Sequence, residues 1–366
     1  EDFTDLLAHP NAAVVALVQG RLAAKSTIGE TRAARLLRSG SNGKALPVYL
    51  NYCGAHTTRW SGGDKINYQN FKKTGSLRKA IQAPEGYQLV VIDSKTIEPC
   101  VLAWLAGETW LLEAFRKGLD PYLIFGSEVY GRPITKADKM ERMVSKVCVL
   151  ALGYQMGGPK LQVGILAESI RQGLPPTRMD LPTCYGLVNK YRAKNRRIKA
   201  LWEFANNNVI WQLAFGNADT IREYKGIRYG RDIIQLAGHL AMYYPETHAR
   251  VTTSASSAWG PPGLDVERIE DASYHTPNGR SKLYGGLVTE NVVQYLARIV
   301  VAEQMLVISK RYRVVLMEHD MVAFLAPTKE AQKALDWGLE VMRTSPAWAL
   351  DLPVDAEGGF DKVYSK

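Results

Sequence analysis

Two aspartates each follow a short apolar run that is typical of a buried β-strand. Leu89–Ile92 ends in Asp93, and two later strands, residues 313–318 and 321–326, form a hairpin with His319-Asp320 at its tip. A strand of this kind delivers a carboxylate to a cleft at the edge of a sheet. Taken alone, Asp93 is better explained as a surface or capping residue, and a His-Asp pair is common by chance. A metal-dependent phosphohydrolase would need further His and Asp residues, which we do not find.

A helix expected over residues 138–157 carries a second set of chemically useful side chains. Arg142, Lys146 and Leu150 are each four residues apart and share one face, and Tyr154 continues the line if the helix persists through Gly153. Cations at one end of such a stripe suit phosphates, and an aromatic ring at the other suits a stacked base. The simpler alternative is a solvated helix with a core tyrosine.

Polar and basic segments elsewhere favour contacts to sugar, phosphate and base edges. The segment of residues 57–70, TTRWSGGDKINYQN, holds Arg59, Asn67, Gln69 and Asn70 beside two aromatic rings. Residues 190–202 hold six cations and no acid, which makes them a candidate for contact with a nucleic-acid backbone, although such a run is usually a solvated helix face.

The composition is that of a globular chain, and its basic excess favours a polyanionic partner, although many proteins this basic bind no polyanion. The chain has 366 residues, 46% of them hydrophobic, a formal net charge of +10 and a pI near 9.3. Its four cysteines show no paired zinc spacing, and we expect reduced thiols in a cytoplasmic setting. We expect no apolar run long enough to span a bilayer, no signal segment and no membrane partner. The first residue, Glu1, indicates a processed or truncated chain.

Several further elements must position these side chains. We expect helices in residues 1–45, over 110–118, from Asp120-Pro121-Tyr122 to Gly131, and over 289–310, where Gln294 and Arg298 lie one turn apart on one face. A strand is expected over 46–50, and a helix from Pro99 to Gly107 should follow the Asp93 strand. Residues 206–285 read as short strands and loops of a variable insertion.

Five segments in this order resemble the family A DNA polymerases, the group that contains bacterial DNA polymerase I, and within it the phage-type members. They are TTRWSGGDKINYQN at 57–70, DSKTIE at 93–98, the Arg142, Lys146 and Tyr154 spacing, GGLVTENVVQ at 285–294, and Glu318-His319-Asp320. The resemblance covers nearly the whole chain. It implies an α+β right-hand fold with a partial thumb at 1–45, palm at 46–105, fingers with a variable insertion at 106–285, and further palm at 286–366.

The resemblance also implies a mechanism, which is template-directed addition of deoxyribonucleotides to a primer 3′-hydroxyl. Two Mg²⁺ ions, for which Mn²⁺ can substitute, would be held by Asp93, Asp320 and the carbonyl of Ser94. Arg142 and Lys146 would neutralise the triphosphate, Lys146 would protonate the pyrophosphate, Tyr154 would stack on the new base pair, and Glu98 would exclude a 2′-hydroxyl. Leu150 and Tyr122 would complete the nucleotide site. The implied primer-template contacts are Arg59, Asn67, Gln69, Asn70, Gln294, His319 and Lys25.

Some positions depart from the family pattern and define the alternatives. Cys100 stands where most members have Arg, Leu150 where an aromatic residue is common, Tyr122 where bacterial enzymes have His, Met321 where Glu is usual, and Ile299 where phage members have an acid. One alternative is a catalytically impaired, polymerase-derived nucleic-acid-binding protein. The single-subunit RNA polymerases are a second alternative, disfavoured by Glu98. We expect no proofreading exonuclease in this chain, a monomer, and a location in the cytoplasm of a bacterial or phage-infected cell.

Overall fold

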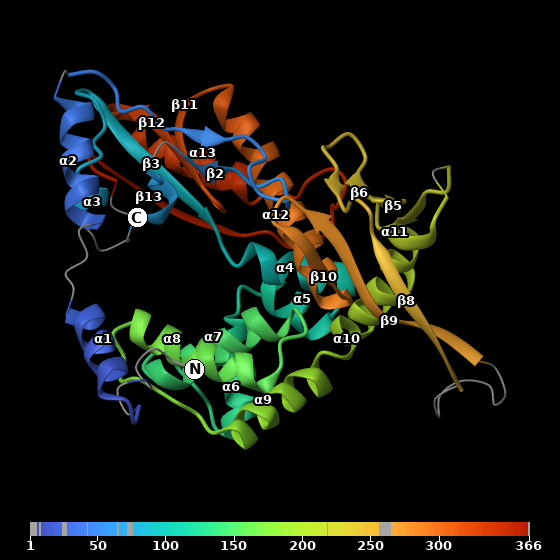
Figure 1. Ribbon diagram of the computed structural model, residues 1–366. Helices are drawn as coiled ribbons and strands as arrows, with labels where there is room; N and C mark the ends of the chain where they lie inside the picture. Colours follow the sequence, from blue (N-terminus) through green and yellow to red (C-terminus); the bar gives the residue numbers. More distant parts are fainter. Residues whose placement is uncertain are drawn as a thin grey trace.

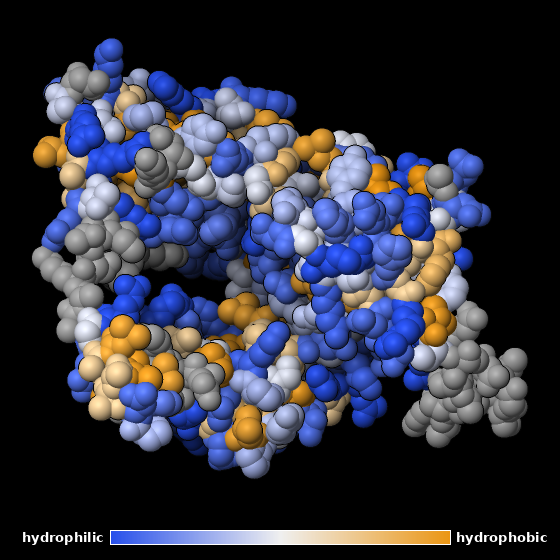
Figure 2. Space-filling model, in the orientation of Figure 1, coloured by the Kyte–Doolittle hydropathy of each residue, from blue (hydrophilic) through white to orange (hydrophobic). Residues whose placement is uncertain are grey.

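The computed structural model describes residues 6, 9–23, 28–41, 43–63, 66–71, 76–217, 219–255 and 265–364. A sheet covered by helices faces a second, wholly helical body, and a β-rich insertion lies to one side (Figure 1). Figure 2 shows a deep hollow between the first two bodies, with largely hydrophilic walls. The mixture of helices and antiparallel sheets confirms the α+β fold class.

A four-stranded antiparallel sheet carries both predicted aspartates. Its strand order is β11-β12-β3-β13, and β3 lies between β12 and β13. The strand that ends near Asp93 and the His-Asp hairpin are both confirmed, whereas the fourth strand was not expected from the sequence. The strands are β3 (Tyr87–Ser94), β11 (Arg313–Glu318), β12 (Met321–Pro327) and β13 (Ala356–Asp361).

The β3 strand is buried on both faces, which explains its unbroken β-branched run. Val90 and Ile92 join a core formed with α13 (Ala331–Met342) and the end of α12. Leu89 and Val91 join a second core on the opposite face. Side chains alternate along a strand, so Asp93 shares the face of Leu89 and Val91. Two hydrophobic layers therefore fix the strand that presents Asp93.

Helix α12 (Gly285–Ser309) runs through the middle of the molecule and contacts α4, α10, α13 and the sheet. The expectation of no membrane-length apolar segment was wrong, because this 25-residue helix is long and apolar enough, with a mean hydropathy of 1.4 over its best window. Acidic and basic residues interrupt the apolar pattern, which hid the segment in the sequence. More than half of that window is buried inside the protein, as in a core helix.

The start of α12 is packed unusually closely. A Cβ added to Gly285 would lie 2.0 Å from the backbone oxygen of Trp202, and one added to Gly286 would lie 2.5 Å from the Cβ of Gln155. Any larger residue at either position would push the helix away from these segments. The two glycines therefore allow α12 to approach the helical body.

The helical body follows the α4 helix and agrees with most of the expected helices. Gly107 and Gly131 end the helices at 97–106 and 121–130 in the left-handed conformation, and Asp120 caps the start of the second one through the amide of Tyr122. The long helix expected over 138–157 is shorter and stops before Tyr154. The helices are α4 (Ile97–Ala106), α5 (Thr109–Arg116), α6 (Pro121–Tyr130), α7 (Lys139–Leu152), α8 (Gly158–Arg171), α9 (Leu181–Lys194) and α10 (Arg196–Phe204).

The insertion begins with helix, contrary to expectation, because a π-helical turn (Ala205–Ile210) and α11 (Trp211–Phe215) continue α10. The strands after it are confirmed, but two of them are long and form an arm that projects from the molecule (Figure 1). The strands are β4 (Arg222–Tyr224), β5 (Ile227–Gly230), β6 (Ile233–Leu236), β7 (Met242–Tyr243), β8 (His248–Ala255), β9 (Asp265–Thr276) and β10 (Gly279–Leu283).

The N-terminal segment is helical, as expected, and then becomes irregular. The strand expected over 46–50 was wrong, because only Leu50 of that range pairs, in a two-residue strand with Asn51, and Pro47 lacks the N–H that a ladder requires. The elements are α1 (Ala12–Ala23), α2 (Ile28–Gly40), β1 (Leu50–Asn51), β2 (Ser61–Gly62), a 3₁₀ turn (Tyr68–Asn70) and α3 (Ser76–Lys79), and a later 3₁₀ turn (Thr328–Glu330) precedes α13.

Candidate active site

The hairpin brings the two aspartates to one edge of the sheet. Met321 lies directly opposite Asp93 across the β12–β3 ladder, and the amide of Ser94 donates to the carbonyl of Asp320 at 2.9 Å. His319 holds the left-handed conformation with φ of 49°, which makes the two-residue turn possible. Asp93 and Asp320, far apart in the chain, thus become neighbours beside the backbone hydrogen bond that joins Ser94 to Asp320.

A buried ion pair stabilises the β11–β12 hairpin at the residue before its turn. Arg78, on α3, lies 3.2 Å from the Oε2 of Glu318 and stacks on the ring of Tyr364 with its Cζ 3.8 Å from the centroid. The Tyr364 hydroxyl donates to the same carboxylate oxygen at 2.6 Å. Burial and the neighbouring Glu318 and Asp93 carboxylates raise the pKa of Tyr364, so it stays a neutral donor. These contacts hold Glu318 one residue before the His319-Asp320 turn.

A small pocket gathers five of the predicted site residues from four separate segments. Arg59, Glu98, Gln294, His319 and Asp320 line it. The remaining lining residues are Ile97, Ala297 and Arg298.

A hydrogen-bonded chain organises this pocket. Arg59 donates to Glu98 at 3.1 Å and to the Oε1 of Gln294 at 2.8 Å. Gln294 in turn donates to Glu290, one turn earlier on α12, at 3.1 Å. Because Arg59 bridges the α4 helix and α12, it sets where Glu98 and Gln294 lie.

The electrostatics of the pocket follow from partial burial. Burial raises the pKa of Glu98, the Glu290 carboxylate adds to this rise, and the Arg59 guanidinium opposes it. Burial also raises the pKa of Glu290. At His319, burial lowers the pKa and the charge of Arg59 lowers it further, so its imidazole is neutral at neutral pH.

Arg142 and Tyr122 lie together away from this pocket. The Nε and Nη2 atoms of Arg142 donate to one oxygen of Asp120, at 3.1 and 2.7 Å. The other oxygen of Asp120 caps α6. Tyr122 is buried in the helical body with its ring 5.8 Å from the Arg142 guanidinium carbon. Arg142 is therefore held in place by a carboxylate, and a nucleotide contact by Tyr122 stays a prediction.

The predicted alignment of side chains along one face of α7 is confirmed as far as Leu150, but Tyr154 lies beyond the end of the helix. Arg142, Lys146 and Leu150 are all half-buried, and Leu150 packs against the core of the helical body. The hydrogen bond from Arg171 is the main cause of the lowered pKa of Glu168, and Lys146 contributes to it, which places Lys146 near α8.

Tyr154 sits in a turn beyond the helix and still reaches the vicinity of the pocket. A Cβ on the preceding Gly153 would lie 2.6 Å from a methyl of Leu102 on α4, so the turn packs closely against that helix. Gln155 adopts φ of 66° and accepts a hydrogen bond from the amide of Gly286. Burial raises the pKa of Tyr154 well above its usual value, and the Glu98 and Glu290 carboxylates add to the rise.

The predicted primer-template residues ahead of Asp93 have partly structural roles. The Asn67 side chain caps a 3₁₀ turn by accepting a hydrogen bond from the backbone N–H of Gln69. The side-chain amide of the buried Gln69 donates to the carbonyl of Met317 on β11. Asn70 is exposed and Ser94 is buried. Lys25 lies outside the described residues.

Sequence reasoning missed several residues that surround the site. Glu357 lies directly opposite Asp93 on β13, which places a second carboxylate beside it. Arg78 and Asp120 are ion-pair partners distant in sequence from Glu318 and Arg142. Of these neighbours of the site, only Glu290 could have been predicted from the sequence, because it precedes Gln294 by one turn of the same helix.

Asn195 divides the basic run at 190–202 between the end of α9 and the start of α10. Local partners engage several of its cations: Lys190 donates to the carbonyl of Val129, Lys194 pairs with Glu128, and Arg197 donates to the carbonyl of Gly107. Arg196 donates to the carbonyl of Ala193, and Lys199 lies 3.7 Å from the Oε1 of Glu203. These two cations and Arg192 line an open groove with Asn189 and Glu203. Contact with a nucleic-acid backbone stays a prediction for this groove.

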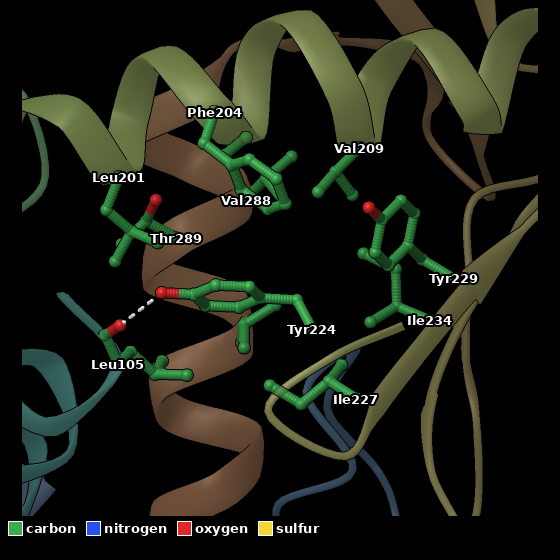
Figure 3. A pocket seen from close by; sticks show the side chains of 12 residues that line it. Leu105, Leu201, Phe204, Val209, Tyr224, Ile227, Tyr229, Ile234, Val288 and Thr289 are labelled. Atoms are coloured by element: carbon green, nitrogen blue, oxygen red, sulfur yellow. Dashed lines mark hydrogen bonds between the residues drawn. The ribbon is translucent and has the colours of Figure 1, made fainter. Parts of the chain in front are cut away.

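A second cavity differs sharply in character. It lies between the insertion, α10, the π-helical turn and α12, and the hydroxyl of Tyr224 donates to the carbonyl of Leu105 at its rim (Figure 3). The described residues that line it, such as Val209, Ile227 and Val288, include no carboxylate or cation. It is therefore unsuited to phosphate chemistry.

Comparison with known proteins finds a family match and several similar polymerases. The model of DNA polymerase family A matches residues 12–171. Those residues are therefore similar to DNA polymerase family A. The DNA polymerase of Bacillus phage SP02 is 29% identical over 302 residues, covering 79% of this chain and 43% of the phage protein. DNA polymerase I of Chloroflexus aurantiacus is 33% identical over 181 residues, covering 48% of this chain and 18% of that protein.

A solved structure of a polymerase domain supports the fold. The POL domain of Pol1 from M. smegmatis, in complex with DNA primer-template and dNTP, superposes with a TM-score of 0.65 at 18% identity, covering 99% of this chain and 55% of that one. This confirms the right-hand polymerase fold predicted from the motifs. The chain spans less than half the length of the two curated relatives above. Family A DNA polymerases generally depend on divalent metal ions.

The departures from the family pattern occupy apolar surroundings. Cys100 is buried, and its thiol donates to the carbonyl of Pro353 at 3.2 Å. Burial raises the pKa of this thiol to about 12, so it is neutral. Ile299 and Met321 are also buried. A charged side chain at these positions would need a buried partner, which accounts for the neutral residues there.

Proposed function

We propose that this chain is a template-directed DNA polymerase that adds deoxyribonucleotides to a primer 3′-hydroxyl. The observation that carries the proposal is the meeting of Asp93 and Asp320 at one sheet edge, beside a pocket lined by Arg59, Glu98 and Gln294. The family A match over the residues that include Asp93 and α7 supports it.

The donor set fits hard divalent cations. Asp93 and Asp320 offer carboxylate oxygens, and Glu357 lies opposite Asp93 across the ladder. Like charges directly opposite one another destabilise a sheet, and a cation nearby would relieve this cost. Among the described residues no compact group of three acidic, His or Cys ligands occurs, which suits Mg²⁺ because it keeps several waters. Two bound Mg²⁺ ions would activate the attacking oxygen and stabilise the leaving one, and Mn²⁺ can substitute.

The remaining side chains bind and orient the reactants. Arg142, held by Asp120 through one edge of its guanidinium, keeps its Nη1 donors for the triphosphate. Lys146 neutralises the triphosphate and delivers a proton to the departing pyrophosphate. Tyr154 supports the new base pair by stacking.

Glu98 acts as the sugar filter in this proposal. Its carboxylate is fixed by Arg59 at 3.1 Å, so it cannot swing away without breaking an ion pair. A fixed side chain below the sugar leaves no room for a 2′-hydroxyl. The primer-template duplex is the proposed macromolecular partner, with Arg59, Gln294 and His319 at its primer end.

The test is primer extension with Mg²⁺ by the intact chain and by Asp93→Asn and Asp320→Asn. We expect both variants to lose about a thousandfold or more in rate, because metal stabilisation is worth several kcal/mol. Both should still bind the duplex. Asp361→Asn, an exposed substitution at the far end of β13, is the matched control and should extend normally.

Two outcomes separate the alternatives. Duplex binding without extension by the intact chain would overturn the polymerase proposal and favour a non-catalytic nucleic-acid-binding protein. Preferential use of ribonucleotides by the intact chain would instead favour an RNA polymerase activity and remove the role given to Glu98.

A further inference from the structure

Arg298 is a buried cation of the pocket that the proposed mechanism does not use. It lies on α12 one turn after Gln294, so the two side chains share a helix face, and both line the pocket that contains Asp320. Only 8% of Arg298 is exposed.

The surroundings of Arg298 are aromatic. Its guanidinium carbon lies 4.0 Å from the centroid of Trp60 and 5.4 Å from that of Tyr52. Its Nη2 approaches the sulfur of Cys53 at 3.9 Å. These contacts orient the guanidinium as a flat group on an aromatic platform.

The charge of Arg298 has no acidic partner among the described residues, and its buried Nε has no hydrogen-bond partner there. The other buried arginine in this part of the chain, Arg78, has Glu318 at 3.2 Å, and the half-buried Arg59 has Glu98 at 3.1 Å. An unpaired buried charge is costly, so a site that keeps one is suited to an anion that arrives from outside.

We propose that Arg298, stacked on Trp60, binds a phosphodiester of the primer strand next to its 3′ end. This inference rests on the proposed function, which brings the primer 3′-hydroxyl to Asp93 and Asp320. Asp320 and Arg298 line the same pocket, so a primer end at Asp320 carries its nearest backbone phosphates past the guanidinium. A guanidinium matches a phosphate with paired N–H donors, whereas the carboxylates in the pocket would repel a free, fully charged phosphate.

The test measures binding of primer-template duplexes that each carry one neutral methylphosphonate linkage near the primer 3′ end. We expect the wild-type chain to lose about tenfold in affinity at one linkage, as for a charge-assisted hydrogen bond. Arg298→Met should lose the same factor on the unmodified duplex and show no further loss at that linkage. For Arg298→Met, the slope of log K against the logarithm of salt concentration should be shallower than the wild-type slope by about one unit.

Matched variants separate binding from folding. Arg311→Met removes an exposed arginine that also stacks on rings, 5.2 Å from Tyr312 and 5.1 Å from Trp337, and should change nothing. Arg298→Lys should recover part of the affinity, because it keeps the charge. Trp60→Leu, which removes the platform, should raise the KM for duplex with little change in kcat.

The results distinguish this inference from the proposed function. If Arg298→Met keeps the sensitivity at that linkage, or loses affinity equally at every linkage, the inference is overturned even when the chain extends primers. A loss of affinity that depends on changes to the base edges of the duplex, and not on the neutral linkage, would also overturn the inference. It would indicate that Arg298 contacts a groove of the duplex. If wild type shows the sensitive linkage without any extension, the proposed function fails and the phosphate contact stands.

Discussion

Removal of Arg78 should destabilise the hairpin that carries Asp320. The Arg78 side chain is 2% exposed, pairs with Glu318 at 3.2 Å, donates to the carbonyl of Phe71 at 3.3 Å and stacks on Tyr364. Arg78→Met keeps most of the packing volume but leaves the carboxylate without its cation. Breaking a buried ion pair from one side costs about 3–5 kcal/mol.

The lower end of that range applies here. Glu318 is 16% exposed and keeps the Tyr364 hydroxyl at 2.6 Å, so water and one donor still serve the carboxylate. We therefore expect a loss of about 3 kcal/mol in the free energy of unfolding. Adding Glu318→Gln removes the stranded charge and should restore about 1–2 kcal/mol.

Urea unfolding of the two single variants and the double variant measures these free energies. Native-state hydrogen exchange at β11 and β12 amides then reports whether the loss is local to the sheet. Arg171→Met is the control, because its ion pair with Glu168 has an arginine 67% exposed and should contribute less than about 1 kcal/mol. A loss below about 1 kcal/mol for Arg78→Met, or a double variant no better than the single, would refute this reasoning.

Three further predictions concern the sugar filter, the pH dependence and the closest helix contact. Glu98→Ala should lower the preference for deoxyribonucleotides over ribonucleotides by about tenfold or more in competition assays, while Glu290→Gln keeps it. Burial raises the pKa of Glu290 above its ordinary 4.5 in the folded protein. The folded state therefore loses stability as the pH rises from 4.5 toward the raised pKa, because the unfolded chain ionises first. In urea unfolding, Glu290→Gln should have the same free energy of unfolding as wild type at pH 4 and a growing advantage toward pH 7. A difference that stays constant with pH would contradict the assignment. Gly285→Ala forces a Cβ against the Trp202 carbonyl and should cost about 1–3 kcal/mol in urea unfolding, whereas Gly164→Ala, with its nearest atom at 3.7 Å, should stabilise by about 0.5–1 kcal/mol.

Much of the local structure was predictable because the signals are local. The apolar run before Asp93 must be buried on both faces, and Asp120 with Pro121 marks a helix start through capping and a fixed φ. The order of the motifs further predicted the right-hand fold. Element ends were less reliable: α7 stops at Leu152, where packing on α4 and α12 overrides the helical periodicity.

The partners of the site residues were not predictable, because each contact closes a long loop of chain. Nothing near Arg78 in sequence announces Glu318, and nothing near Asp93 announces Glu357 on the last strand. The unpaired state of Arg298 is likewise a property of the assembled pocket. The sequence by itself determined which residues can do the chemistry and which strands and helices carry them. Only the tertiary structure decided which charges are paired and which are left for a ligand, since pairing depends on distances between segments and on the water excluded around them.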